Sequence, residues 1–409
     1  MFEASALYRR SAFEDVAKAA IQGYKGQHRE VRMRFGRRQC LKAITGGVVA
    51  ATAAGSAKSL ALAARSESKA EASKLAMPGL YRGRVVAVRN PAVFASGQYQ
   101  AEAVRLMMRQ GMKELTGADD WTEAWRQFFE PGDVVGIKLN PVGQPLAKSD
   151  ETVVREIIAG LEAAGVKRRD IVAYDRYRAE FFRAGYDKWL PEGVRTSYAT
   201  DQVDPTQQAI EGYDPDHYMD MALTLPGFSV DNLTARRSYA ARFITREVNK
   251  LVSVPVLKDH QSAGVTLALK NLSHGLVNNV NRSHSSSSLN ACNAFIPAVV
   301  AMPVIRNKAV LHILDGVKGV YHGGPTSKPQ FVWEHKTLYF ATDPVALDHI
   351  GWDVIDAQRV SVGMKKLVES VPDQFSTFVH RQPEHVEIAG ALGLGEWDRA
   401  KINLRQIEG

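Results

Sequence analysis

Residues Leu251–Gly275 have the sequence LVSVPVLKDHQSAGVTLALKNLSHG, in which two different apolar patterns follow one another. Residues 251–257 are almost continuously apolar and rich in valine, which is typical of a strand buried in a parallel sheet. From Val265 to His274 the apolar residues return at helical spacing, and Gly275 is a typical helix end. A strand, a short turn and a helix in this order predict one unit of a parallel α/β sheet.

The same alternation of short apolar runs and helix-period segments recurs along the chain. Strands are expected at residues 84–88, 133–139, 170–174, 251–257, 309–314 and 337–341, with a late one at 386–390. Helices are expected at residues 101–115, 151–164, 265–274 and 344–356. Because strands separated by helices pair in parallel and need cover on both sides, the sequence predicts an α/β fold, a mostly parallel sheet with helices on both faces.

Residues 176–245 interrupt this alternation and are rich in Tyr, Asp and Pro. We expect them to form an insertion over the sheet, either as a cover on the substrate side or as a peripheral decoration. Residues 278–293, NNVNRSHSSSSLNACN, are polar and form either a lid or a plain connecting loop.

The formal net charge of +8 is concentrated near the N-terminus. Residues 1–63 contain 11 Lys and Arg but only 4 Asp and Glu, so the rest of the chain is close to neutral. A nearly neutral domain lacks the basic surface that nucleic-acid binding requires, which argues against a nucleic-acid partner. We expect three parts, namely a leader at residues 1–63, a polar linker at 64–80 and an α/β domain at 81–409.

The leader has the layout of an export signal. Arg37-Arg38 precedes a weakly apolar run rich in Ala and Gly, which ends in Ala61-Leu62-Ala63, an A-x-A cleavage site. The arginine pair resembles the twin-arginine signal, and the low apolarity and Lys58 suit that route. The alternative is a cytosolic helix with an incidental arginine pair.

The twin-arginine interpretation predicts an exported protein, in the periplasm or otherwise outside the cytoplasm, with the twin-arginine translocase as a partner. The motif lies unusually far from residue 1, and Met33 stands just before it, so we expect Met33 to be the true start.

Cysteine is scarce, with two residues in the whole chain, Cys40 in the leader and Cys292 in the domain. After export the mature chain would keep only Cys292, so we expect no intrachain disulfide, no Cys-ligated iron–sulfur cluster and no Cys-rich zinc site. The identity of any cofactor stays open. We also expect a soluble mature protein, because no later segment has the roughly 18 consecutive apolar residues that span a bilayer.

Polar and charged residues recur where the expected strands end. They are Lys138, Asn140, Asp175, Lys258, Asp259, His260, Asp315 and Asp343. In an open parallel sheet the ligand crevice lies beyond the carboxyl ends of the strands, so this pattern predicts a site at that edge. The same residue types are also common in ordinary strand-to-helix turns.

Several of these side chains have a structural alternative. Asp343 precedes Pro344, which favours a helix cap over a site role. Asp348, one turn later, suits either the helix dipole or a site, and Asp315 forms either a local turn or a substrate contact. Lys138 lies inside a buried strand and needs a partner, in either a structural ion pair or a functional contact.

The helix after the opening strand carries charge on one face. Thr266, Lys270 and His274 are spaced four residues apart, which places them along one side of the helix. Lys270 and Asn271 interrupt an otherwise apolar run. A lysine buried there either pairs with a carboxylate or has a lowered pKa.

Two lysines and two histidines have chemical roles to consider. Lys258 and Lys270 either hold a substrate carboxylate or phosphate or act as bases once desolvated. His260 either transfers protons, binds a metal or has neither role. The turn at His322-Gly323 either allows a ligand close to the backbone or is only a tight loop.

Four motifs together resemble the DUF362 family of uncharacterised proteins. They are DVVGIKLNPVGQP (133–145), PVLKDHQSAGVTLALKNLSHG (255–275), ILDGVKGVYHGGP (313–325) and FATDPVALDHIG (340–351). The resemblance covers roughly residues 130–355, and residues 176–245 diverge from it. It implies an α/β domain but no agreed reaction, and the ferredoxin-type segment of some members is missing here because its cysteines are missing.

These observations predict an enzyme that acts on a small anionic or carbonyl-bearing molecule. The expected catalytic residues are Lys258, His260 and Lys270. The expected substrate-binding residues are Lys138, Asn140, Asn271, Asp315, His322, Gly323 and Asp348. The carboxylates of Asp315, Asp343 or Asp348 would orient the bases or hold a divalent metal. The alternatives are a non-catalytic periplasmic ligand-binding or redox-accessory protein, and lysines that serve only in structural ion pairs.

Overall fold

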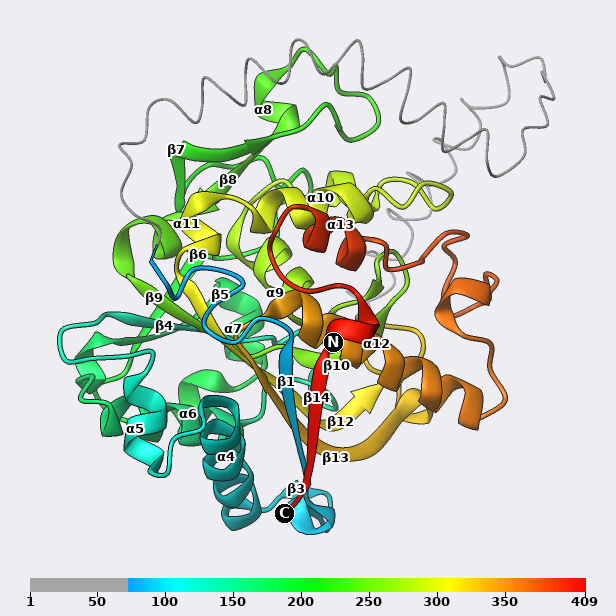
Figure 1. Ribbon diagram of the computed structural model, residues 1–409. Helices are drawn as coiled ribbons and strands as arrows, with labels where there is room; N and C mark the ends of the chain where they lie inside the picture. Colours follow the sequence, from blue (N-terminus) through cyan, green and yellow to red (C-terminus); the bar gives the residue numbers. More distant parts are fainter. Residues whose placement is uncertain (1–72) are drawn as a thin grey trace, which may run out of the picture. The chain divides into compact units, whose positions relative to one another are not determined.

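The computed structural model describes residues 73–409, and Figure 1 shows their arrangement. The expected leader at residues 1–63 and the first part of the expected linker lie outside the described residues. The structure therefore bears on the α/β domain, and the export signal is not part of what it describes.

The centre of the described chain is a ten-stranded mixed sheet. Its strands are β1 (Arg84–Arg89), β4 (Val135–Lys138), β5 (Ile171–Tyr177), β6 (Arg195–Thr200), β9 (Lys250–Ser253), β10 (Val256–His260), β11 (Gly264–Val265), β12 (Ala309–Val320), β13 (Val332–Ala341) and β14 (Asn403–Glu408). They run in the order β14-β1-β13-β12-β9-β4-β5-β6, with β10 paired to β12 and β11 to β10. Most neighbouring strands are parallel, as predicted.

Helices cover both faces of this sheet (Figure 1). Apart from the short helix α8 (Leu233–Arg236), the described α-helices are α4 (Ala101–Thr116), α5 (Trp121–Arg126), α6 (Glu151–Ala163), α7 (Arg178–Arg183), α9 (Leu267–Leu276), α10 (Cys292–Val300), α11 (Pro303–Arg306), α12 (Pro344–Ser361) and α13 (His385–Ala391). Val86 belongs to the apolar cluster of α4 and α6, while its neighbour Val85 belongs to that of α9 and α12. Adjacent strand residues thus serve opposite faces, which confirms the predicted α/β architecture.

One long strand, β13, is antiparallel to both of its neighbours, β1 and β12. Residues 321–331 connect β12 to β13 and contain only a single short 3₁₀ turn, Pro329–Phe331. A parallel return needs a crossover of a dozen or more residues, usually with a helix, so this shorter connection brings the chain back antiparallel.

The strand expected at residues 251–257 is divided into two. β9 ends at Ser253 and pairs with β4, whereas β10 begins at Val256 and pairs with β12. Pro255 separates them because proline has no N–H to donate to a strand ladder. β10 then continues to His260, so Lys258, Asp259 and His260 belong to the strand itself instead of following it.

The late strand expected at residues 386–390 was wrong, because these residues lie in helix α13. Val386 and Ala389 are both buried, at the three-residue spacing of a helix face. A run of five residues is too short to separate that spacing from strand alternation. The last strand of the chain is β14, which pairs with β1.

The insertion expected at residues 176–245 has two parts. β6 joins the edge of the central sheet beside β5. β7 (Tyr213–Asp220) and β8 (Arg237–Ala241) form a separate antiparallel pair, connected through the short helix α8 (Leu233–Arg236). Asn279 holds this part in place by donating from Nδ2 to the carbonyl oxygens of Ala235 and Arg237, at 2.8 and 3.0 Å.

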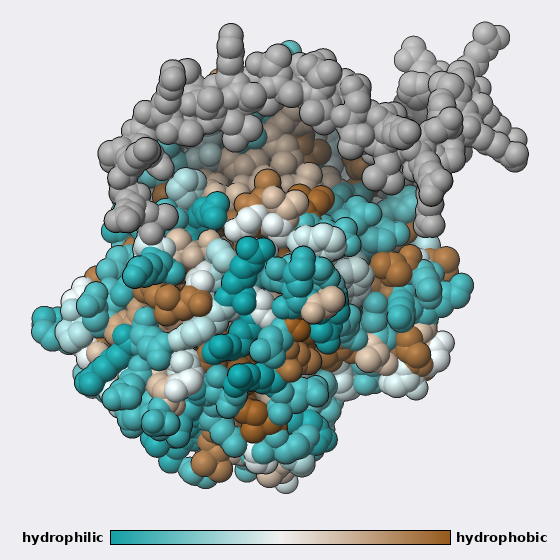
Figure 2. Space-filling view, in the orientation of Figure 1, coloured by the Kyte–Doolittle hydropathy of each residue, from teal (hydrophilic) through white to brown (hydrophobic). Residues whose placement is uncertain are grey.

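On the face shown in Figure 2, hydrophilic residues predominate and the hydrophobic ones form small separate patches. Within residues 73–409, no helix combines the length and the apolar character needed to cross a bilayer.

The start of α9 is fixed by a carboxylate from another helix. Asp348 of α12 accepts hydrogen bonds from the backbone N–H groups of Ala268 and Leu269, at 2.7 and 2.9 Å. Leu267, the first residue of α9, has φ of 40°, in the region that side chains other than Gly seldom adopt. Asp348 is fully buried. It caps the N-terminus of α9 although it belongs to another helix, and it supports the strained residue Leu267.

We predict that Asp348→Ala lowers the free energy of unfolding by about 2 kcal/mol, because two buried N–H groups lose their acceptor. Urea denaturation of the purified protein measures this difference. Asp353→Ala is the matched control on the same helix, since Asp353 is half exposed and its pair with Arg399 contributes little. Equal losses in the two variants would contradict the capping role.

Candidate functional site

A cavity of about 370 Å³ lies at the carboxyl ends of β4, β5 and β10, beside α9. Six residues that the sequence predicted for a site line it, namely Lys138, Asn140, Lys258, His260, Lys270 and Asn271. Val203 and Gln207 of the insertion also line it, as do Val280, Asn281 and His284 of the polar segment 278–293. The insertion therefore borders the cavity, which favours a cover over a peripheral decoration.

Lys138, the last residue of β4, forms a buried ion pair with Asp175 of β5, with 2.6 Å between Nζ and Oδ1. These two residues lie on adjacent parallel strands, so the sheet itself brings them together. Gly275 leaves room for the lysine, because a Cβ built there would lie 2.0 Å from Lys138 Cε. Lys138 thus has the partner that a buried lysine needs, and it also lines the cavity.

Two asparagines extend this arrangement toward the second lysine. Asn140 Nδ2 donates to Asn271 Oδ1 at 3.1 Å, and Asn271 Nδ2 donates to Ser253 Oγ at 3.1 Å. Asn140 Oδ1 in turn accepts from Lys258 Nζ at 2.8 Å. Because each amide has its donor and acceptor engaged, the orientation of both side chains is defined.

Lys258 is completely buried in β10, and its ammonium group has no carboxylate within ion-pair distance among the described residues. Its hydrogen-bond partners are the neutral oxygens of Asn140 and of the Val142 backbone. Burial, together with the positive charges of Lys270 and Lys138, lowers the pKa of Lys258 to about 7. Lys258 can therefore exist in both protonation states near neutral pH.

Lys270 lies in the middle of α9 and faces the same cavity. Its Nζ lies 3.2 Å from His284 Nε2, and burial lowers its pKa to about 8. Thr266 and His274 also line the cavity, so the charged helix face that the four-residue spacing predicted is the face toward the cavity.

His260 is held by the backbone at the end of β10. Its Nδ1 accepts from the N–H groups of Ser262 and Ala263, at 3.1 and 3.2 Å. Burial, followed by the charge of Lys270, holds the pKa of His260 well below its usual range. The ring is therefore neutral with its proton on Nε2, which makes it a hydrogen-bond donor from the remaining nitrogen.

Asp259, between the two cavity residues of β10, serves the opposite side of the strand. It accepts from Gly324 N–H at 2.8 Å and lies 3.4 Å from Arg381 Nη1. Strand alternation thus sends Lys258 and His260 to the cavity and Asp259 away from it.

Four predicted site residues are not brought to the cavity, namely Asp315, His322, Gly323 and Asp348. Asp315 lies in the interior of β12, which continues to Val320, so it does not stand at a strand end as expected. Its carboxylate accepts from Tyr99 Oη at 3.0 Å and from Asp150 N–H at 3.1 Å. The acceptor atoms of Asp315 are therefore engaged by the protein.

His322 and Asp348 have structural partners as well, and Gly323 lies in a loop that reaches the cavity at another residue. His322 Nε2 lies 2.7 Å from Asp373 Oδ2, and the loop that contains Gly323 reaches the cavity with Pro325 instead. Asp348 caps α9, as described above. Asp343, for which a cap was the favoured interpretation, accepts from the N–H groups of Val345 and Ala346, at 3.0 and 2.9 Å.

The cavity also contains charged residues that the site prediction left out. They are Asp175, Arg176, Glu180 and His284. The strand-end pattern already included Asp175, and it could have included Arg176, the next residue. Glu180 and His284 lie in segments without a periodic pattern, and only the folded chain brings them near the lysines.

The fold and the cavity define an α/β protein with a buried, lysine-rich site at the carboxyl edge of its sheet. Residues 218–353 match the family described as "Domain of unknown function (DUF362)", which supports the resemblance seen in the sequence. The match includes Lys258, His260 and Lys270, whereas Lys138 and Asp175 lie before it.

Two solved structures are similar to this chain. One is the crystal structure of a structural-genomics target from Thermotoga maritima, with 12% identity, a TM-score of 0.32, and 65% of this chain and 60% of that chain covered. The chain thus spans less than two thirds of that protein. The other is loganic acid methyltransferase with SAH, with 7% identity, a TM-score of 0.26, and 72% and 70% covered. None of the curated proteins compared matches this chain.

We predict that Asp175→Asn lowers the free energy of unfolding by about 3–5 kcal/mol, because it leaves Lys138 buried without its counter-charge. The double variant Lys138→Met/Asp175→Asn should lose less, since it buries no unpaired charge. Urea denaturation of both variants tests this order. A double variant less stable than Asp175→Asn would contradict it.

Proposed function

We propose that the cavity binds a small anionic, carbonyl-bearing molecule and that the protein is an enzyme acting on it. One observation carries this proposal: Lys258 and Lys270 face one cavity, and neither has a carboxylate partner among the described residues. Burying a cation without a counter-charge is costly. An anionic ligand between the two ammonium groups would offset that cost, so the site suits carboxylates or phosphates in particular.

The residues around the cavity supply complementary roles in proton transfer. Lys258, with its pKa lowered to about 7, can bind an oxygen anion as an ammonium group and accept a proton as an amine. His260 is neutral and can donate a hydrogen bond from Nε2 to a carbonyl oxygen of the ligand. Lys270 would neutralise the ligand's negative charge. This arrangement supports proton abstraction next to a carbonyl group.

The reaction is tested by incubating the protein with pyruvate or 2-oxoglutarate in deuterated water. The proposal expects faster exchange of the protons next to the carbonyl group than in buffer alone, and loss of that acceleration in Lys258→Met. Binding of these acids without any exchange would instead indicate a ligand-binding protein without catalysis, the alternative that the sequence also allowed.

We predict that the affinity for malonate and pyruvate falls as the pH rises through about 7, because Lys258 then loses its charge. The carboxylate of pyruvate stays ionised throughout, so its change in affinity reports on the protein. Lys258→Met should bind about tenfold to a hundredfold more weakly at low pH and lack the decline through pH 7. Isothermal calorimetry at a series of pH values measures both effects.

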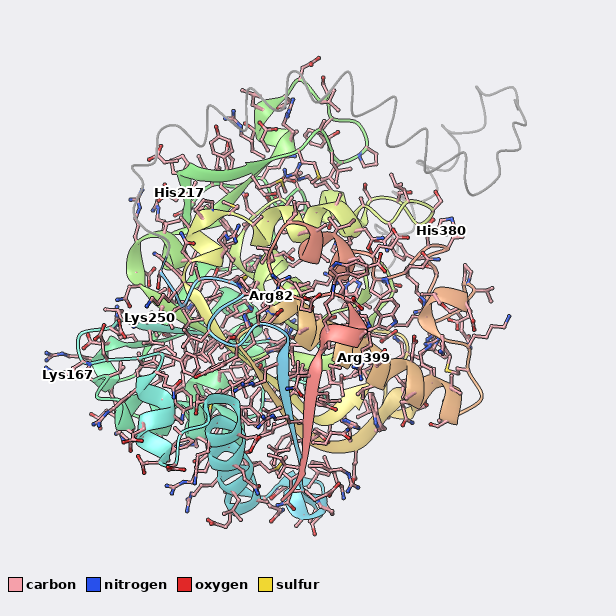
Figure 3. All side chains as sticks on the ribbon, viewed as in Figure 1. Arg82, Lys167, His217, Lys250, His380 and Arg399 are labelled. Atoms are coloured by element: carbon pink, nitrogen blue, oxygen red, sulfur yellow. The ribbon has the colours of Figure 1, made fainter. Side chains whose placement is uncertain are left out.

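Lys167→Met is the matched control, because Lys167 is exposed and projects from the edge of the molecule (Figure 3). It should reproduce the wild-type affinity at every pH. If Lys258→Met and Lys167→Met behaved alike, the cavity would not be the anion site.

We also propose that the chain is exported by the twin-arginine translocase and acts outside the cytoplasm. The support is the arginine pair Arg37-Arg38, followed by a weakly apolar run and an A-x-A site.

We predict that Arg37→Lys/Arg38→Lys retains the full-length chain in the cytoplasm, because the translocase reads the arginine pair. Cell fractionation and the mass of the exported chain measure the effect. Arg168→Lys/Arg169→Lys is the matched control, since this exposed arginine pair lies in the folded domain and should not affect export. Export of both variants alike would refute the twin-arginine route.

A further inference from the structure

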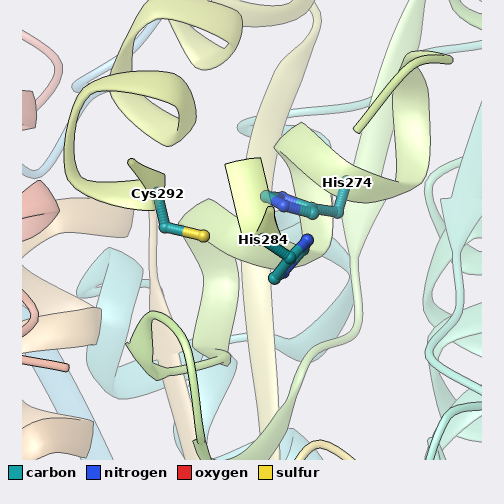
Figure 4. Close-up of side chains that lie close together, drawn as sticks. All are labelled: His274, His284 and Cys292. Atoms are coloured by element: carbon teal, nitrogen blue, oxygen red, sulfur yellow. The ribbon is translucent and has the colours of Figure 1, made fainter. Parts of the chain in front are cut away.

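We propose that His274, His284 and Cys292 form a binding site for a transition-metal ion of borderline softness, with Zn²⁺ as the leading candidate. Figure 4 shows the three side chains close together. The ligand atom that each side chain offers lies within 4.8 Å of the other two. The inference goes beyond the proposed function and does not depend on it, because it concerns metal binding without a substrate.

Three different elements bring these side chains together. His274 is near the end of α9, His284 ends the 3₁₀ helix Asn281–His284, and Cys292 begins α10. Both histidines line the cavity, and Cys292 is buried behind them. Two of the three ligands thus come from the polar segment 278–293. The sequence alone did not decide whether this segment is a lid or a plain connecting loop.

The hydroxyl of Ser283 lies among the three ligand atoms. Its Oγ is 3.0 Å from His274 Nε2, 3.3 Å from His284 Nδ1 and 3.6 Å from Cys292 Sγ. In a tetrahedral zinc site with bonds of about 2.0–2.3 Å, neighbouring ligand atoms lie roughly 3.3–3.7 Å apart. The hydroxyl is therefore already near the spacing of a neighbouring ligand position. A contraction of about 1 Å among the three side chains would complete the site.

The second nitrogen of each imidazole has its own contact. His274 Nδ1 lies 2.9 Å from Ser273 Oγ. His284 Nε2 lies 3.2 Å from Lys270 Nζ, and it can donate a hydrogen bond there only when Lys270 is in its amine form. These contacts orient His274 Nε2 and His284 Nδ1 toward Ser283.

The donor set decides the class of metal. Two imidazole nitrogens and one thiolate sulfur suit Zn²⁺ and other late transition metals, whereas Mg²⁺ and Ca²⁺ prefer oxygen ligands. The hard-cation site that the sequence suggested at Asp315, Asp343 or Asp348 has no comparable support, because those carboxylates accept hydrogen bonds from the protein. Binding would release the thiol proton of Cys292 to solvent, leaving a thiolate bonded to the metal.

The site would have a direct relation to the cavity. Three protein ligands leave a fourth position of a tetrahedral ion, which Ser283, water or a ligand oxygen would take. Because the two histidines line the cavity, that position is within reach of a molecule bound between the lysines. A metal there would polarise the same carbonyl group that His260 contacts in the proposed function.

Co²⁺ is the probe that tests this site, because it reports thiolate coordination in its absorption spectrum. The full chain, stripped with a chelator and kept reduced, is titrated with Co²⁺ and then with Zn²⁺. We expect one equivalent to bind, with a sulfur-to-cobalt charge-transfer band in the near ultraviolet, and Zn²⁺ to abolish that band. Absence of stoichiometric binding of either ion would overturn the proposal.

Variants locate the ion. Cys292→Ser should lose the charge-transfer band, and His284→Asn should weaken Co²⁺ binding by about tenfold or more. His380→Asn, at an exposed histidine (Figure 3), should match the wild type. Circular dichroism checks the fold of each variant, and His284→Asn alone decides the outcome if Cys292→Ser folds poorly. Wild-type binding and spectrum in a folded His284→Asn would overturn the assignment.

Lys258→Met separates this proposal from the proposed function. It should retain the cobalt spectrum while losing affinity for malonate. A protein that binds malonate but no Co²⁺ would refute the metal site alone, and one that binds Co²⁺ but no malonate would refute the anion site alone.

Discussion

The buried ion pair between Lys138 and Asp175 is the interaction on which the candidate site depends. It joins the last residue of β4 to the adjacent parallel strand β5, with 2.6 Å between the charged atoms. Its position next to α9 allows Asn271 and Asn140 to continue the polar contacts as far as Lys258. One lysine of the cavity is thus neutralised within the protein, and this leaves the positive charge of the other two available to a ligand.

The acidic residues explain why that charge remains uncompensated. Several buried carboxylates lie near the sheet, but they accept hydrogen bonds from backbone N–H groups or pair with arginines away from the cavity. Asp348 and Asp343 stabilise helix starts, and Asp259 points to the opposite side of β10. The fold therefore uses its buried acids for architecture, so that the cationic character of the cavity results from how charges are distributed rather than from how many there are.

Much of the fold could be predicted from the sequence because strand and helix periods are local signals. The place of Lys258, His260 and Lys270 could be predicted as well, since the first two directly follow the expected strand at residues 251–257 and Lys270 lies in the expected helix. Asp315 could not, because only strand pairing shows that β12 continues past it to Val320. His284 and Cys292 approach His274 through the folding of a polar segment with no periodicity, and no local pattern encodes that approach.

Gly275 and Asp348 together have a mechanical consequence for the cavity. Asp348 fixes the first turn of α9, and at the other end the stem of Lys138 occupies the space beside Gly275, whose carbonyl accepts from Tyr174 Oη at 3.1 Å. The helix can therefore neither slide along its axis nor turn about it without breaking buried contacts. A ligand bound as proposed would pass the insertion and residues 278–293, which also line the cavity, while Lys270 on α9 keeps its position.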